Sequence, residues 1–182
     1  MEAVIQSFFL VLISEMGDKT QLLALVLATR FKKPWTIMAG ILVATLLNHG
    51  FASWAGVWVS TMISPIYLRW ILAAIFFAFA LWILVPDKDE ELKENQKYGA
   101  FLTTVVTFFL AEMGDKTQLA TIALGARFAS PILVTMGTTL GMLIADGLVV
   151  FFGEKLTAKI PMKWIRIFAC VLFAVFGILI II

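Results

Sequence analysis

The chain has 182 residues, of which 62% are hydrophobic and only 14% are charged, with a formal net charge of +2. A soluble domain of this composition would precipitate, so the sequence predicts an all-α polytopic membrane protein held in a lipid bilayer. The apolar runs are continuous rather than alternating, which excludes a β-barrel. Nucleic acid is excluded as a partner, because the net charge is small and no basic cluster carries interleaved aromatic residues.

Six apolar segments are long enough to cross a bilayer, for which about 20 residues suffice. Prolines and charged residues lie in the gaps between them. The segments are residues 3–28, 35–59, 67–86, 98–125, 131–153 and 163–182. The hydrophilic residues 87–97 predict a cytoplasmic linker between two three-helix units. These units, 1–86 and 98–182, are expected to form one domain together.

One eight-residue sequence occurs twice. Glu15–Leu22 (the first motif) and Glu112–Leu119 (the second motif) both consist of Glu-Met-Gly-Asp-Lys-Thr-Gln-Leu, at an offset of 112 − 15 = 97 residues. Identity continues to Phe31 and Phe128, because the eight motif positions and three later ones, 11 of 17, are the same. The two units are therefore in register, and since three is odd, the second enters the membrane from the opposite face. Such inverted repeats are typical of secondary transporters, whose ion sites lie between the halves.

Each motif places two carboxylates and a lysine near the middle of an apolar segment. Insertion scales put such a charge at the helix centre at roughly 2.5–3.5 kcal/mol. Six unpaired charges would cost on the order of 15–20 kcal/mol, more than the typical folding stability of about 5–15 kcal/mol. The charges must therefore be paired, protonated, hydrated or bound to a cation.

On a regular helix, the two acids and the glutamine of each motif point to one side. The six side chains are Glu15, Asp18, Gln21, Glu112, Asp115 and Gln118. Their carboxylate and amide oxygens suit a hard divalent cation such as Mg²⁺, Mn²⁺ or Ca²⁺. Zinc and copper sites would want several His or Cys ligands, and the chain has one of each. Gly17 and Gly114 could loosen the helix for the ion or could simply allow close packing.

The remaining polar motif residues have two interpretations each. Lys19 and Lys116 follow their glutamates by four residues, so ion pairs within each helix are possible. Thr20 and Thr117 could bind the ion or could hydrogen-bond to the preceding turn. Four carboxylates and two lysines sum to −2, a charge that one divalent cation or two protons would neutralise. The hypothesis is an electroneutral exchange of one divalent cation for about two protons.

Further polar residues lie in the second segment of each unit. Asn48 and His49 lie mid-span, and the offset of 97 places His49 at the position equivalent to Asp146. These side chains could relay protons or support the ion ligands, although a lone histidine in an apolar helix is often only hydrogen-bonded. Small residues at a spacing of four predict close helix packing in the same segments. They are Gly40 with Ala44 and Gly137 with Gly141.

The basic residues predict the orientation in the membrane. Ten of them flank the gaps after the first, third and fifth segments, and two flank the other side. The ten are Arg30, Lys32, Lys33, Lys88, Lys93, Lys97, Lys155, Lys159, Lys163 and Arg166, and the two are Arg69 and Arg127. The first set is expected in the cytoplasm, which puts both termini outside it.

Two copies of Glu-x-Gly-Asp-Lys-Thr in a six-span inverted repeat resemble the transmembrane protein 165 family, along the whole chain. That family includes Golgi cation/proton exchangers and bacterial manganese exporters of the MneA type. The resemblance implies transport of Mn²⁺, or also Ca²⁺ in eukaryotic members, against protons. It places the acidic motif residues of the family on Glu15, Asp18, Glu112 and Asp115. The short chain resembles the bacterial members, which implies export across the inner (cytoplasmic) membrane.

The sequence thus predicts a proton-coupled Mn²⁺ exporter that works by alternating access and is not an enzyme. Its expected partners are the divalent metal ion, protons and the lipid bilayer, with no cofactor. A monomer could suffice, and a homo-oligomer is compatible with the pattern. A Ca²⁺/H⁺ exchanger is the alternative in the same class. An intramembrane enzyme, a divalent-cation channel and a structural scaffold are more distant alternatives, since a scaffold leaves the buried charges unexplained and an enzyme would not need a duplicated acidic cluster.

Overall fold

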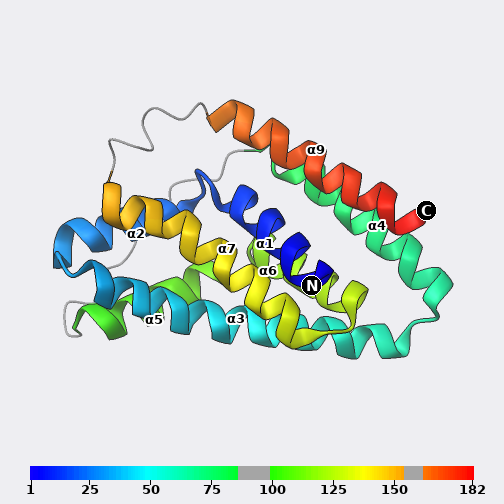
Figure 1. Ribbon diagram of the computed structural model, residues 1–182, viewed down its shortest axis with the longest axis horizontal. Coiled ribbons are helices and arrows are strands. Elements are labelled where there is room, and N and C mark those ends of the chain that lie inside the picture. The colour runs from blue at the N-terminus through cyan, green and yellow to red at the C-terminus, as the bar shows by residue number, and fades with distance from the viewer. Residues whose placement is uncertain (86–98, 154–161) are drawn as a thin grey trace.

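The computed structural model describes residues 1–85, 99–153 and 162–182. Within these ranges the chain forms helices and no strands (Figure 1). In order, the helices are α1 (Glu2–Glu15), α2 (Lys19–Phe31), α3 (Pro34–Met62), α4 (Pro65–Trp82), α5 (Ala100–Glu112), α6 (Lys116–Phe128), α7 (Pro131–Phe152) and α9 (Met162–Ile181). The predicted linker 87–97 lies outside the described residues.

Among the described residues, four helices are long and apolar enough to cross a membrane by themselves. They are α3, α4, α7 and the part of α9 from Lys163 to Ile181. Prolines begin three of them, at Pro34, Pro65 and Pro131, where the missing N–H and the fixed φ suit the first helical turn. Many of their large apolar side chains remain exposed on the protein surface, as a lipid environment requires. The chain is therefore a multi-pass membrane protein.

The structure corrects the prediction of a regular helix through each motif. The segments 3–28 and 98–125 are both interrupted, because α1 and α5 end at the glutamate of the motif and α2 and α6 begin at its lysine. Gly17 (φ 82°) and Gly114 (φ 78°) adopt left-handed backbone angles at the breaks, which residues with a Cβ avoid. Of the two roles considered for these glycines, loosening of the helix is the one observed.

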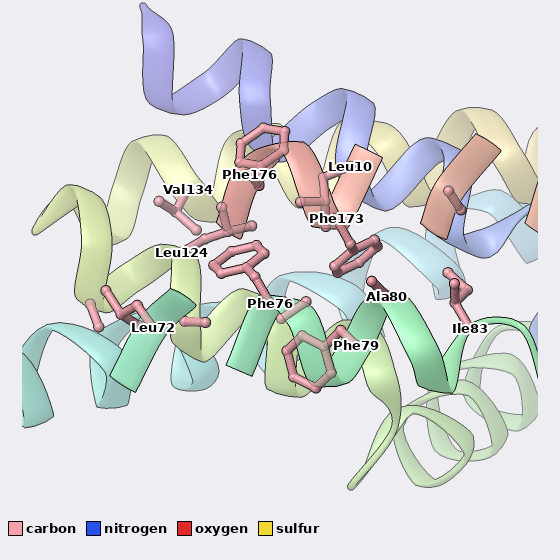
Figure 2. Packing of buried hydrophobic residues seen from close by; sticks show 14 of the residues in the cluster. Leu10, Leu72, Phe76, Phe79, Ala80, Ile83, Leu124, Val134, Phe173 and Phe176 are labelled. Atoms are coloured by element: carbon pink, nitrogen blue, oxygen red, sulfur yellow. The ribbon is translucent and has the colours of Figure 1, made fainter. Parts of the chain in front are cut away.

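Helices α4 and α9 pack along each other through phenylalanines that are equivalent in the repeat. The ring centroids of Phe76 and Phe173 are 6.0 Å apart. Phe76 with Phe176 and Phe79 with Phe173 both have a separation of 5.9 Å. These rings, together with Leu10 of α1 and Leu124 of α6, belong to one buried apolar cluster (Figure 2). The interface between α4 and α9 is thus symmetric in its ring separations, although the Phe76–Phe176 rings are stacked and the Phe79–Phe173 rings meet edge to face.

Small residues bring the other helices into close contact, as predicted for Gly40, Gly137 and Gly141. A Cβ on Gly137 would meet the carbonyl oxygen of Val4 in α1, and a Cβ on Gly141 would lie 2.7 Å from that of Phe8. In the equivalent place of the other unit, a Cβ on Gly40 would lie 2.7 Å from Cβ of Thr104 in α5. Packing between α3 and α6 is as close, because Gly56 faces the backbone of Ile122 and Gly125 faces that of Ser53.

Candidate cation site between the two motifs

The two helix breaks bring the four acids of the motifs into the protein interior. Glu15 and Glu112 are 0% and 1% exposed, and Asp18 and Asp115 are each 6% exposed. Each glutamate is the last residue of one helix, and each aspartate is the N-cap of the next. The helix breaks therefore place all four predicted acids in one buried region.

The lysines pair across the repeat rather than within it. Lys19 Nζ lies 3.2 Å from Asp115 Oδ1. In the reciprocal pair, Lys116 Nζ lies 3.3 Å from Asp18 Oδ1. The structure thus does not contain the Glu–Lys pairs that a continuous helix would allow, because the break after the glutamate carries each lysine toward the other half. Each aspartate charge is compensated by a lysine of the opposite motif.

Threonine hydroxyls orient the two glutamates. Thr20 donates a hydrogen bond of 2.7 Å to Glu15 Oε2, and Thr117 donates one of 2.9 Å to Glu112 Oε2. The other carboxylate oxygens, Glu15 Oε1 and Glu112 Oε1, have no hydrogen-bond partner among the described residues. Each glutamate therefore keeps one oxygen that could bind a cation. The sequence predicted that these threonines bind the ion or hydrogen-bond to the preceding turn, and the observed contact with the glutamate is neither of these.

The motif glutamines hold the broken backbone in place. Gln21 Oε1 accepts a hydrogen bond of 2.8 Å from Gly17 N–H, and Gln118 Oε1 accepts one of 2.7 Å from Gly114 N–H. Such partners are needed where a helix is interrupted inside a membrane. The same glutamines reach the second helix of the opposite half, where Gln21 donates to the carbonyl oxygen of Ala145 and Gln118 donates to Asn48 Oδ1, both at 2.7 Å. Their amide oxygens are thus engaged by the backbone rather than left for an ion.

Asn48 and His49 contact or approach motif side chains, and Asp146 lies within range of a Coulombic interaction with Glu112. Asn48 also donates to the carbonyl oxygen of Phe109, at 2.9 Å. His49 Nε2 lies 4.0 Å from Glu112 Oε2, and both residues are buried. Asp146 is 0% exposed, and neither of its carboxylate oxygens has a hydrogen-bond partner among the described residues. A buried acid of this kind needs a proton, a cation or a water molecule for compensation.

Three of these acids can share one ion. Glu15, Glu112 and Asp115 can each offer a carboxylate oxygen such that all three oxygens lie within 4.8 Å of one another. Oxygens bound to one Mg²⁺, Mn²⁺ or Ca²⁺ at about 2.0–2.6 Å are at most about 4–5 Å apart, so the spacing fits a single divalent cation. The crosswise lysines were missed at the sequence level. The inverted repeat that the sequence predicts is the signal that could have found them, because it would set each lysine beside the opposite aspartate.

A multi-pass helical protein that gathers paired acids from two equivalent helix breaks has the features of an ion transporter. Comparison with known families agrees: residues 3–91 and 100–182 match the family model described as "Divalent cation/proton antiporter GDT1". The chain belongs to this family, which confirms the family resemblance of the doubled motif and supports a transport role over an enzymatic one.

Individual relatives cover most of the chain. A protein of Vibrio cholerae named "Putative manganese exporter" is 47% identical over 157 residues, which cover 86% of this chain and 78% of the relative. GDT1-like protein 3 of Oryza sativa is 28% identical over 97% of this chain and 72% of the relative. A GDT1-like protein of Synechocystis is 27% identical over 93% of this chain and 91% of the relative. No solved structure matches the chain.

Proposed function

We propose that the protein exports Mn²⁺ in exchange for protons by alternating access. In this proposal the chain crosses the membrane six times, with α1–α2 and α5–α6 each forming one interrupted crossing. Residues 1–86 and 98–182 are the two inverted repeats, and 87–97 is a cytoplasmic linker. The resemblance to bacterial members of the family favours the inner membrane of a bacterium, and the basic residues favour both termini outside the cytoplasm.

The observation that carries the proposal is the charge that remains after the reciprocal pairs are counted. Lys19 compensates Asp115 and Lys116 compensates Asp18, at 3.2 and 3.3 Å. Glu15 and Glu112 are left, each with one carboxylate oxygen that has no partner in the described parts of the chain. Together they carry −2, which one Mn²⁺ or two protons would neutralise. A site that must be neutral in both forms exchanges one for the other.

The proposed ligands are Glu15, Glu112 and Asp115, with Asp18 as the equivalent of Asp115. The threonines and glutamines of the motifs orient these ligands, as surrounding hydrogen bonds do in other metal sites. Asn48 supports Gln118, and His49 and Asp146 lie where a proton could pass to or from the glutamates.

Proton movement driven by the metal tests the proposal. Purified protein in proteoliposomes that contain a pH-sensitive dye should release protons from the lumen when Mn²⁺ is added outside. Glu15→Gln and Glu112→Gln should each lower this flux about tenfold or more. Loss of a group that only supports a metal ligand already lowers metal affinity or activity about 10–100-fold. Glu2→Gln is the matched control, because Glu2 is exposed at the start of α1. Mn²⁺ entry without proton release, or full flux in both glutamate variants, would contradict the proposal.

Ca²⁺ is the alternative cargo, because the oxygen ligands suit it as well. Mn²⁺ is preferred since a relative at 47% identity is named for manganese. A competition series separates the two: excess Ca²⁺ should leave Mn²⁺-driven proton release nearly unchanged if Mn²⁺ is the cargo. An ohmic single-channel current in place of saturable flux would instead indicate a channel.

A further inference from the structure

The two motifs and the α4–α9 pair each keep the symmetry of the repeat. Equivalent distances in the motifs differ by 0.2 Å or less, as in the two Lys–Asp pairs at 3.2 and 3.3 Å and the two Thr–Glu bonds at 2.7 and 2.9 Å. Within the pair, the two equivalent phenylalanine contacts are both 5.9 Å. The motif region and the α4–α9 pair are thus two bodies with the same internal twofold symmetry. If they do not share the symmetry axis, the pair can dock on the motif region in two equivalent positions.

The pair is docked to one side. Helix α9 packs on α1, and α4 packs on α6, whereas no comparable contact joins α9 to α2 or α4 to α5 among the described helices. Figure 1 shows α4 and α9 side by side, away from the end of the molecule that holds α2 and α5. Exposure follows the same asymmetry, because Met113 of the second motif is 57% exposed while the equivalent Met16 is half-buried.

The helices other than α4 and α9 also pack more closely at one end of the molecule than at the equivalent end. Gly56 of α3 meets the backbone of α6, but the equivalent residue, Gly153 at the end of α7, has nothing within 4 Å of its added Cβ. The side chain of Lys19 at the start of α2 is 27% exposed, against 10% for Lys116 at the start of α6. Among the described residues, packing is therefore closer around α1 and α6 than around α2 and α5.

The docked pair places Arg166 at a cavity that residues of the first motif also line. Arg166 of α9 and Val85, which follows α4, line a cavity of about 10 Å³ together with Ser14, Asp18 and Lys116. A cavity of this volume has room for about one water molecule. At the offset of 97, the equivalent of Arg166 is Arg69.

Arg69 lies elsewhere in this state. It donates a hydrogen bond of 3.4 Å to the carbonyl oxygen of Ile181, at the far end of the α4–α9 pair. The group of acids that can share an ion differs between the motifs in the same way. Among the described residues it includes Asp115, which does not line the cavity of Arg166, and does not include Asp18, which does.

We propose that Arg166 and Arg69 are alternating partners of the two motif aspartates and are carried between them by the α4–α9 pair. In the present state Arg166 stands at Asp18, and Asp115 joins the two glutamates as a cation ligand. In the opposite state the pair docks on α2 and α5, Arg69 stands at Asp115, and Asp18 becomes the ligand. This proposal rests on the transport function above and adds two functional residues outside the motifs.

The positive charge gives the arginines a role in the transport step. A guanidinium beside one aspartate stabilises the interaction of that carboxylate with cationic side chains. The metal ion therefore binds on the side of the other aspartate. Movement of the pair then transfers the ion from one aspartate to the other while the glutamates hold it throughout. The reaction needs no ligand beyond those already present in the two motifs.

Cross-linking distinguishes the two docked states. In a Cys170→Ala background, which removes the one native cysteine, Ser14→Cys with Val85→Cys reports the present state. The equivalent pair, Ala111→Cys with Ile182→Cys, reports the opposite state. Both pairs should react with a short bis-methanethiosulfonate linker in native membranes, and either cross-link should stop Mn²⁺ flux until it is reduced. A second pair that never cross-links in membranes that transport Mn²⁺ would overturn the proposal.

Charge variants test the arginines themselves. Arg166→Gln should shift the cross-linked fraction from the first cysteine pair to the second by about threefold, the scale of a partly exposed charge interaction. Arg69→Gln should shift it the opposite way, and Arg166→Lys and Arg69→Lys should keep the original ratio. Equal loss of both cross-links in the Gln variants would mean a merely structural role. Both cysteine pairs cross-linking in protein that moves no Mn²⁺ would instead refute the proposed function while leaving the two docked states in place.

Discussion

The hydroxyl groups of Thr20 and Thr117 determine which oxygen of each glutamate is left to bind the proposed cation. Each hydroxyl occupies Oε2 of its glutamate, at 2.7 and 2.9 Å. Thr20→Val and Thr117→Val keep the shape but remove the donor, so the glutamates lose their fixed orientation. We expect the Mn²⁺ concentration for half-maximal transport to rise about 10–100-fold, the range found when supports of metal ligands are removed. Mn²⁺-dependent flux in proteoliposomes measures it.

Thr121→Val is the matched control for these variants. Thr121 is as buried as Thr20, but its hydroxyl donates to the backbone oxygen of Thr117 at 2.7 Å, as threonines in helices often do. Its replacement should leave the half-maximal concentration within about twofold. A Thr121 variant as impaired as the other two would mean that the effect comes from helix packing and not from the glutamates.

The residue types at the site were predictable, and their pairing was not. Glu15 and Asp18 were identified because charged side chains are costly inside an apolar segment and are found there mainly at functional sites. The assignment of Lys19 to Asp115 depends on how two segments 97 positions apart approach each other, and a pattern within one segment does not contain that information. Gln21 was expected to offer its oxygen to the ion, but the oxygen accepts the N–H that the helix break exposes.

At the scale of single elements, the breaks in α1–α2 and α5–α6 depend on glycine. Gly114 has φ +78°, where an alanine costs about 1–2 kcal/mol, and its added Cβ would touch nothing within 4 Å. Gly114→Ala should therefore lower stability by about 1–2 kcal/mol through the backbone alone and should impair transport because the site moves. Thermal unfolding in detergent, with and without Mn²⁺, measures both effects.

Gly50→Ala gives the opposite expectation and serves as the control. Gly50 also has open space around its added Cβ, but it lies inside the regular helix α3. Alanine should stabilise that helix by about 0.5–1 kcal/mol and should leave transport unchanged. If Gly114→Ala were as stable as Gly50→Ala, the left-handed break would not be a required feature of the second motif.

The sequence does not fix these breaks by itself. The motif residues Lys19, Thr20 and Gln21 are compatible with a helix, and one glycine costs a helix only about 1 kcal/mol. The interruption is maintained because Gln21 satisfies the freed N–H of Gly17 and because Lys19 gains a partner in the other half. Both compensations are tertiary. The apolar segments themselves were predictable from length and hydrophobicity, and α3, α4, α7 and α9 agree with four of the six.

For the whole molecule, the sequence repeat predicts equivalence, and the structure departs from it. Residues equivalent at the offset of 97 have nearly equal contacts in the motifs and between α4 and α9. The docking of the α4–α9 pair is unequal, because it packs on α1 and α6. A repeated sequence is consistent with either docked position and cannot select one. The proposed mechanism needs this equivalence, since both docked positions must have similar free energies if the site is to alternate.

Charge balance across the molecule predicts how transport responds to voltage. In the proposed exchange, Lys19 and Lys116 neutralise the two aspartates throughout, so the −2 of Glu15 and Glu112 would be balanced by one Mn²⁺ or by two protons. Such a cycle moves no net charge. A potential of 100 mV set with potassium and valinomycin should therefore leave the steady Mn²⁺ gradient unchanged. A pH difference of one unit should change that gradient about 100-fold, because two protons each contribute about 1.4 kcal/mol.

An exchange with one net charge would behave differently in the same vesicles. Each elementary charge that crosses the membrane gains about 2.3 kcal/mol per 100 mV, which corresponds to a change of about 50-fold in the steady Mn²⁺ gradient. A voltage response of that size would contradict the proposed count and would indicate that one lysine leaves its aspartate during the cycle. Lys19→Gln and Lys116→Gln then identify which lysine leaves. The side chain of Lys19 is more exposed than that of Lys116, so Lys19→Gln should change the voltage response more than Lys116→Gln.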